Sequence, residues 1–164
     1  MPATLDEVVK GIRNVTASDG GIVATLEQAN LANAVFQGPA LAAAMTTYCQ
    51  QMSLDLLQPL NSGTRPLNED GEAELVANAL RDFVAGALER NELFIVRAPV
   101  FARLGFAELI ATNLRRMEAS GNVLMSMLAD HAYSRRLAIQ EQAAIWSAGI
   151  GTILSVYDNA AING

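Results

Sequence analysis

The sequence is poor in the residues that most often carry chemistry. It contains one cysteine, one histidine, one tryptophan and one lysine among 164 residues. The single Cys49 excludes an intrachain disulfide and a cysteine-based zinc site, and it is typical of a small buried residue in a reducing compartment. The single His131 excludes a multi-histidine metal centre, and no Glu-x-x-His pair is present for a di-iron bundle.

Glycine-rich and acidic motifs are equally incomplete. Gly149 and Gly151 lack the third glycine of a dinucleotide-binding loop, and neither a P-loop nor a nucleophile elbow occurs. The acidic run at 69–72 lacks the alternating ligands of a calcium loop, and we expect it to cap the next helix. These absences predict a protein that is not an enzyme and has no catalytic residues, cofactor or metal.

Charge is scarce and biased toward acid. Charged residues make up 17% of the chain and the formal net charge is −6, with Lys10 and ten arginines as the basic residues. An acidic chain without a basic patch argues against nucleic-acid and anionic-lipid partners. Residues 1–14 contain several charges and therefore do not resemble a signal peptide, and the uncharged apolar run 143–157 is too short for a stable membrane span. We expect a cytoplasmic location.

The residues that are abundant favour helices. The chain is 51% hydrophobic but only 5% aromatic, so its apolar character comes from Ala, Leu, Val, Ile and Met. Ala, Leu and Met are strong helix formers, and the alternation typical of strands is absent. We predict an all-α fold, with a single elongated hairpin or bundle of about five helices over 1–164 and a long C-terminal helix.

Turn signals and apolar spacing set the expected boundaries. We expect Ser18 or Asp19, within the cluster at 16–21, to cap a following helix, and we expect Gly38-Pro39 to break the chain. Residues 59–71 are predicted as a loop and 93–96 as an extended link. The expected helices are 1–14, 22–37, 39–58, 72–91, 99–119 and 122–159.

Charge is also unevenly distributed along the chain. The segment 61–136 holds nineteen of the 28 charged residues, whereas 22–58 and 137–160 carry two each. We therefore treat 61–136 as a charged helical insertion and the two near-neutral segments as assembly helices. They are expected to pair and to contact other copies, because large uncovered apolar surfaces are unusual on monomers.

The last near-neutral segment carries a continuous helical seam. Its large apolar residues recur at intervals of three and four, and Ala148, Gly149 and Gly151 provide a small-residue side for close approach to a neighbour. The predicted assembly interface consists of Ile139, Ala143, Trp146, Ala148, Gly149, Ile150, Gly151, Ile153 and Tyr157, together with Pro39 and Tyr48.

The two near-neutral segments resemble the R-body (killing-trait, Reb) family of ribbon-forming proteins. The first carries Gln28-Ala-Asn30, Gly38-Pro39-Ala40 and Tyr48-Cys-Gln50, similar to the family's Gln-x-Asn helix, Ala-Pro-Ala turn and Tyr-Gln helix. The second carries Gln142-Ala-Ala and 149–158, GIGTILSVYD, similar to the family's ending. The chain departs from the pattern in its charged middle and at Leu154, where the family has Tyr.

This resemblance implies a subunit that polymerises with itself or with homologous subunits into a coiled ribbon that changes shape with pH. Carboxylates brought together at subunit contacts would have raised pKa values and would lose their repulsion on protonation. The candidates for this response are Glu69, Asp70, Glu72, Glu74, Asp82 and His131. The alternative is a helical binding or granule-coat module, similar to phasins, that forms no polymer.

Overall fold

The computed structural model describes residues 2–69 and 71–163, and within these ranges all regular structure is helical. This confirms the predicted all-α bundle and its long C-terminal helix. Five long helices and three short elements follow one another along the chain: α1 (Leu5–Gln28), α2 (Ala34–Met52), the π-helix η1 (Ser53–Leu57), α3 (Gln58–Asn61), α4 (Glu72–Ala102), α5 (Ala107–His131), the 3-10 helix η2 (Tyr133–Arg135) and α6 (Arg136–Asn163).

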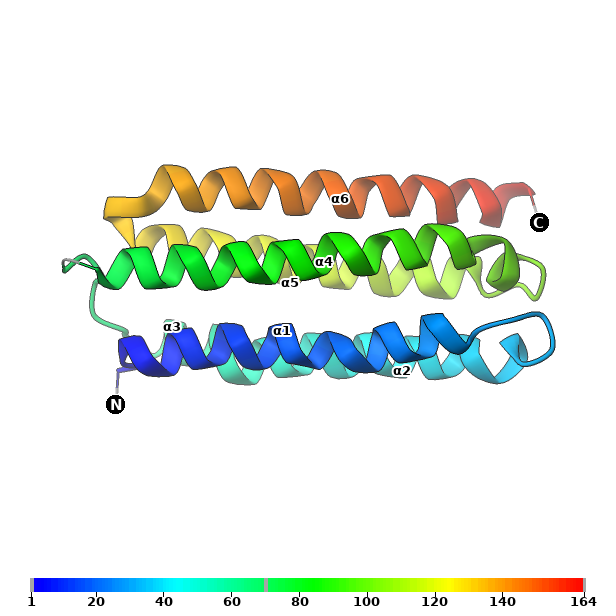
Figure 1. Cartoon of the computed structure of the whole chain (residues 1–164), viewed down its shortest axis with the longest axis horizontal. Helices are drawn as coiled ribbons and strands as arrows, with labels where there is room; N and C mark the ends of the chain where they lie inside the picture. The colour runs from blue at the N-terminus through cyan, green and yellow to red at the C-terminus, as the bar shows by residue number, and fades with distance from the viewer. Residues whose placement is uncertain (1, 70, 164) are drawn as a thin grey trace.

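The five long helices lie lengthwise along one common direction (Figure 1), and their contacts close into a ring. Going around the ring, α1 packs on α2, α2 on α5, α5 on α6, α6 on α4, and α4 on α1 again. Helices α1, α4 and α6 run in one direction, and α2 and α5 run in the other. Because each helix turns one apolar face toward the axis, the interior is a single core built from all five.

The first helix is longer than the sequence predicted. It runs from Leu5 to Gln28 and begins with a capping box, in which Thr4 and Glu7 exchange hydrogen bonds. The expected turn at 16–21 is wrong, because the Thr16 and Ser18 hydroxyls donate to carbonyls of the preceding helical turn. Asp19 therefore lies in mid-helix and does not cap anything.

The first interruption between helices lies at 29–33, between the two predicted breaks at 16–21 and at Gly38-Pro39. The Asn33 side-chain carbonyl accepts a hydrogen bond from the Asn30 amide, and the Asn33 side-chain amide donates to the Gln28 carbonyl at 2.9 Å. Arg97 of α4 donates to the Leu26 and Glu27 carbonyls and so satisfies the end of α1. Gly38 and Pro39 lie inside α2 and do not break it.

The later boundaries also shift. Residues 93–96 continue α4, which ends at Ala102, so the predicted extended link is wrong. The predicted long helix 122–159 is interrupted between Ala132 and Arg135, and Ser120-Gly121 stays inside α5. The loop prediction is confirmed for 62–69, where Leu67 donates its amide to the His131 carbonyl at 2.7 Å.

The two near-neutral segments do not pair as expected. In the ring, the neighbours of α6 are α4 and α5, which come from the charged segment 61–136. These two helices separate α6 from the helices built by residues 22–58. The charged segment therefore supplies two of the five sides of the ring, and its apolar faces contribute to the same core.

A close approach between α5 and α6 depends on Gly121. A Cβ atom at Gly121 would lie only 2.5 to 2.7 Å from the indole of Trp146, whereas a Cβ atom at Gly151 of α6 would meet nothing within 4 Å. The absence of a side chain at Gly121 thus allows the Trp146 ring to lie in the interior.

We predict opposite effects for the two glycine-to-alanine substitutions. Gly121→Ala should lower the free energy of unfolding by about 1–3 kcal/mol, because the Trp146 ring must move. Gly151→Ala should raise it by about 0.5–1 kcal/mol, because alanine restricts the unfolded chain at an open helical position. Urea unfolding of the two variants and the parent measures both values, and equal effects would contradict the packing described.

Candidate functional site

The interior of the ring contains a fully buried arginine. Arg90 lies in α4 on the same face as Phe83, Ala87 and Phe94, which follow one another at helical spacing and are all buried. An arginine at a core position is uncommon, because a buried charge is costly unless it is paired. The residues around Arg90 are therefore a candidate binding site.

Arg90 has one ionic partner and two aromatic partners. Its Nη1 donates to the Asp19 Oδ1 of α1 at 2.5 Å. The guanidinium carbon lies 5.3 Å from the centre of the Tyr48 ring of α2 and 5.7 Å from that of Trp146 of α6. Four helices of the ring thus meet at this cation, which gains cation–π attraction from both rings.

The Arg90 guanidinium still has an unpaired edge. Nε and Nη2 are buried, and neither makes a hydrogen bond of full geometry with a described residue; the same is true of the Tyr48 hydroxyl, which lies close enough to Arg90 to interact with it. The N–H groups of Nε and Nη2 point the same way from the planar group, in the fork that binds a carboxylate with two parallel hydrogen bonds. Such unpaired buried donors are few in native structures, and they favour an acceptor that binds there.

The charges of this cluster follow from its burial and its partners. Burial alone would lower the pKa of the Arg90 guanidinium, but the polar partners around it, the Asp19 carboxylate among them, outweigh that effect and raise the pKa, so the group is a cation. Burial also raises the pKa of the Tyr48 hydroxyl, which stays neutral and able to donate. Burial raises the pKa of the Asp19 carboxyl, and Arg90 opposes that shift.

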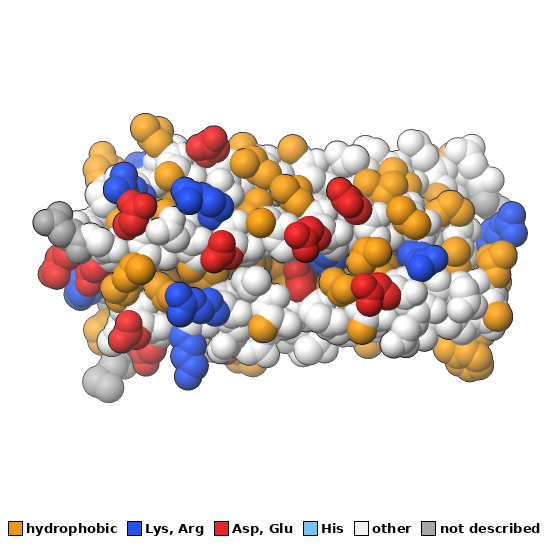
Figure 2. Space-filling view, viewed as in Figure 1, with side chains coloured by type: hydrophobic (Ala, Val, Ile, Leu, Met, Phe, Trp, Pro, Cys, Tyr) orange, Lys and Arg blue, Asp and Glu red, His pale blue; other side chains and the backbone are white. Residues whose placement is uncertain are grey.

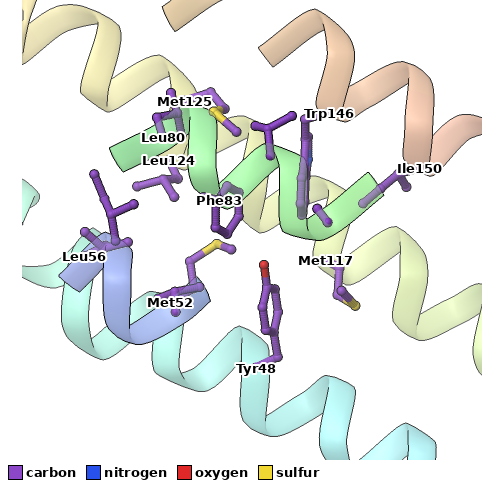
Figure 3. Close-up of a cluster of buried hydrophobic side chains, with 14 of the residues drawn as sticks. Tyr48, Met52, Leu56, Leu80, Phe83, Met117, Leu124, Met125, Trp146 and Ile150 are labelled. Atoms are coloured by element: carbon purple, nitrogen blue, oxygen red, sulfur yellow. The ribbon is translucent and has the colours of Figure 1, made fainter. Parts of the chain in front are cut away.

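Large apolar side chains lie around Tyr48 and Trp146, the two aromatic partners of Arg90 (Figure 3). Trp146 stacks on Phe83 with ring centres 5.1 Å apart, and Tyr48 points into the interior toward these two residues. Met52 and Met117 reach the same space from α2 and α5. Farther along α6, the Tyr157 hydroxyl donates to the Phe94 carbonyl at 2.9 Å, so this second buried tyrosine is satisfied.

A second hollow, between α1 and η1, lies at the surface and is lined by both Lys10 and acidic side chains. That hollow is polar, and its Asp55 carboxylate already accepts from Asn14 and Gln51. Within the described ranges no group of three or more His, Cys, Asp or Glu side chains could hold a metal ion. None of the described helices meets the length and hydropathy needed to cross a bilayer.

Most residues of the predicted assembly interface lie inside the chain. Ile139, Trp146, Ile150, Ile153 and Tyr157 are buried along the inner face of α6, and Tyr48 is buried in α2. These six side chains therefore hold the single ring together.

The small or helix-starting members of that predicted interface have mixed positions. Pro39 and Ala148 are exposed, and Ala143 and Gly151 are half-buried. A Cβ atom at Gly149 would meet Asn91 and Leu88 of α4, so this glycine faces a helix of its own chain.

Three of the residues predicted to respond to pH, Glu69, Glu72 and Glu74, pair with arginines. Glu72 pairs with Arg65, and this hydrogen bond holds the pKa of the Glu72 carboxyl below its usual range, opposite to the raised value expected for crowded acids. Glu74 pairs with Arg135, and His131 contacts the Met127 carbonyl. Glu69 and Asp82 are exposed, and Asp70 lies outside the described residues.

Sequence reasoning missed Arg90 and Asp19. Arg90 falls in the predicted charged insertion 61–136, although its helical spacing with Phe83, Ala87 and Phe94 is a usable signal of burial. Asp19 is predicted as a cap because it lies in the small polar cluster 16–21, just before the helix expected over 22–37. Only the ring shows that these two residues, 71 positions apart, form one pair.

We predict that the pair is coupled in stability. Arg90→Met leaves the Asp19 carboxylate against the core and should cost about 3 kcal/mol at pH 7. Without Arg90 the folded-state pKa of Asp19 rises further above its unfolded value, so the deficit should shrink as pH falls and Asp19 takes up a proton, and grow as pH rises through that pKa.

Urea unfolding at pH 4.5 and pH 7 tests this coupling. The double variant Asp19→Asn/Arg90→Met removes both charges and should be more stable than Arg90→Met at pH 7. A deficit independent of pH, or a double variant less stable than the single one, would contradict the pairing.

Comparisons with known proteins identify the fold. No family model matches the chain, and no curated protein matches it. The structure is similar to the crystal structure of Afmp4p in complex with palmitic acid, with a TM-score of 0.85 and 13% identity over 94% of this chain and 99% of that one. It is also similar to ligand-binding domain 2 of the Penicillium marneffei MP1 protein, complexed with multiple arachidonic acids, with a TM-score of 0.70 and 14% identity over 96% and 97% of the two chains.

These likenesses correct the predicted function. The chain has the helical fold of two proteins solved with fatty acids, and the prediction of a polymerising, pH-responsive ribbon subunit is wrong. Helix-rich composition and near-neutral segments fit both a ribbon subunit and a closed ring, because each must bury apolar helix faces. The fold resolves the choice: this chain has the helix arrangement of fatty-acid-bound proteins.

Proposed function

We propose that the protein binds a long-chain aliphatic ligand, of the fatty-acid class, inside its ring of five helices. The observation that carries this proposal is the match of fold over nearly the whole length of a protein solved with palmitic acid. Three further features of this chain support the proposal: its interior chemistry, the connectivity of its ring and an apolar end surface.

The first argument is the chemistry of the interior. Met45, Met52, Met117 and Met125 are all buried in the core. Methionine is unbranched and flexible, and it can change rotamer around a ligand of varied shape. A core rich in methionine can therefore rearrange around an alkyl chain at a lower cost than one of branched or aromatic residues alone.

The second argument is the connectivity of the ring. The helices are long, up to the 31 residues of α4, or about 45 Å at 1.5 Å per residue, which exceeds the length of an extended palmitic acid. At one end the ring is joined only by the turns 29–33 and 103–106. Side chains fill the interior, so a bound alkyl chain must displace some of them and move helices apart.

The third argument is an apolar end surface. Phe36, Leu104 and Ile162 are 75%, 45% and 81% exposed, and they lie at the end that carries the α1–α2 and α4–α5 turns and the C-terminal residues of α6. Charged side chains are denser toward the opposite end (Figure 2). An alkyl ligand thus has apolar side chains to contact at this end before it reaches the interior.

We predict saturable binding of straight-chain fatty acids, with affinity that rises by up to about fourfold per added methylene from eight to sixteen carbons. Trp146 is the only tryptophan and lies in the core, so its fluorescence reports on the interior. Titrations below the micelle concentration of each acid, repeated by calorimetry, measure the dissociation constants. Absence of saturable binding across the series would contradict the proposal.

A pair of methionine substitutions places the ligand within the fold. Met52→Ala enlarges the interior beside Phe83 and should change the affinity for palmitic acid at least several-fold. Met127→Ala removes the same side chain from a half-buried position in α5 and serves as the matched control, with affinity unchanged. Equal affinities in both variants would place the ligand outside the ring.

A further inference from the structure

The Arg90 cluster has more donors than its protein partners use. Asp19 occupies Nη1 of Arg90, whereas Nε and Nη2 on the other edge, and the Tyr48 hydroxyl nearby, make no hydrogen bond of full geometry with a described residue. The Asp19 carboxylate alone compensates the positive charge of Arg90. The unpaired fork calls for a second acceptor with two oxygens.

A carboxylate fits this fork by geometry and by charge. Its two oxygens match the parallel N–H groups of the guanidinium edge, and a hydroxyl donor beside them adds a third hydrogen bond. The Arg90 and Tyr48 side chains are almost completely buried, so bulk solvent does not reach them. In such a place a charge-assisted hydrogen bond contributes more than it does at the surface.

We propose that the free edge of Arg90, with the Tyr48 hydroxyl, binds the carboxylate of an acidic amphiphile whose alkyl chain lies among the methionines of the ring. This inference rests on the proposed function and specifies it, because it selects an acidic headgroup over a neutral one. Asp19 remains on Nη1 as a competing anion, so it weakens the binding of the acid that Arg90 attracts.

The test compares dodecanoate with 1-dodecanol, which has the same chain length and a neutral headgroup. The readout is the ratio of the two dissociation constants, alcohol over acid, measured at pH 7. In the parent protein the acid should bind at least about tenfold tighter, as expected for hydrogen bonds to a charged group.

Tyr48→Phe is the decisive variant, because it keeps the ring that faces Arg90 and removes only the hydroxyl, which makes no hydrogen bond of full geometry. Its removal should leave the unfolding midpoint unchanged or higher, while the ratio falls several-fold. Tyr157→Phe is the matched control: that hydroxyl is already bonded to the Phe94 carbonyl, so the substitution should lower the unfolding midpoint and leave the ratio as in the parent.

Two charge variants give opposite expectations. Asp19→Asn removes the competing anion and should raise the ratio several-fold, whereas Asp19→Asn/Arg90→Met should bring it to about one. If Tyr48→Phe keeps the parental ratio, the headgroup site is wrong even where acid and alcohol both bind, and the proposed function stands. If the parent binds neither ligand, the proposed function fails and the headgroup site fails with it.

Discussion

The structure depends on one guanidinium buried at the centre of a closed ring. Arg90 is fully buried where α1, α2, α4 and α6 meet, and its charge is compensated by Asp19 and by the faces of Tyr48 and Trp146. Burying an ion pair costs desolvation energy that its attraction does not always recover, so such a pair is a poor source of stability. Its incomplete hydrogen bonding is better explained by a binding role than by a purely structural one.

The ring explains how the remaining core is arranged around that centre. Each long helix packs on two neighbours, so the space along the axis is filled by side chains that come from all five helices. Aromatic and methionine side chains meet there (Figure 3). Gly121 makes room for the Trp146 indole, which in turn stacks on Phe83. The same positions that build the core therefore define the space in which we place an alkyl chain.

The fold class was predictable from composition, whereas the boundaries and the site were not. Helix formers and the seam from Ile139 to Tyr157 correctly indicated an all-α bundle with a long, inward-facing last helix. Local turn signals failed at Gly20-Gly21 and at Pro99, because tertiary packing keeps α1 and α4 continuous through them. The pairing of Asp19 with Arg90 could not be predicted, since it depends on which helices become neighbours in the ring. The apolar seam of α6 was predicted to be an assembly interface, because apolar residues recur at the same helical spacing on a helix face that packs inside a chain and on one that contacts another subunit.

The most direct measurement is a crystal structure of the protein grown with palmitic acid. The account predicts one alkyl chain inside the ring, with its carboxylate within hydrogen-bond distance of Nε and Nη2 of Arg90 and with Met52 or Met117 displaced. An alkyl chain found only on exposed residues such as Phe36, with the interior side chains unmoved, would contradict it.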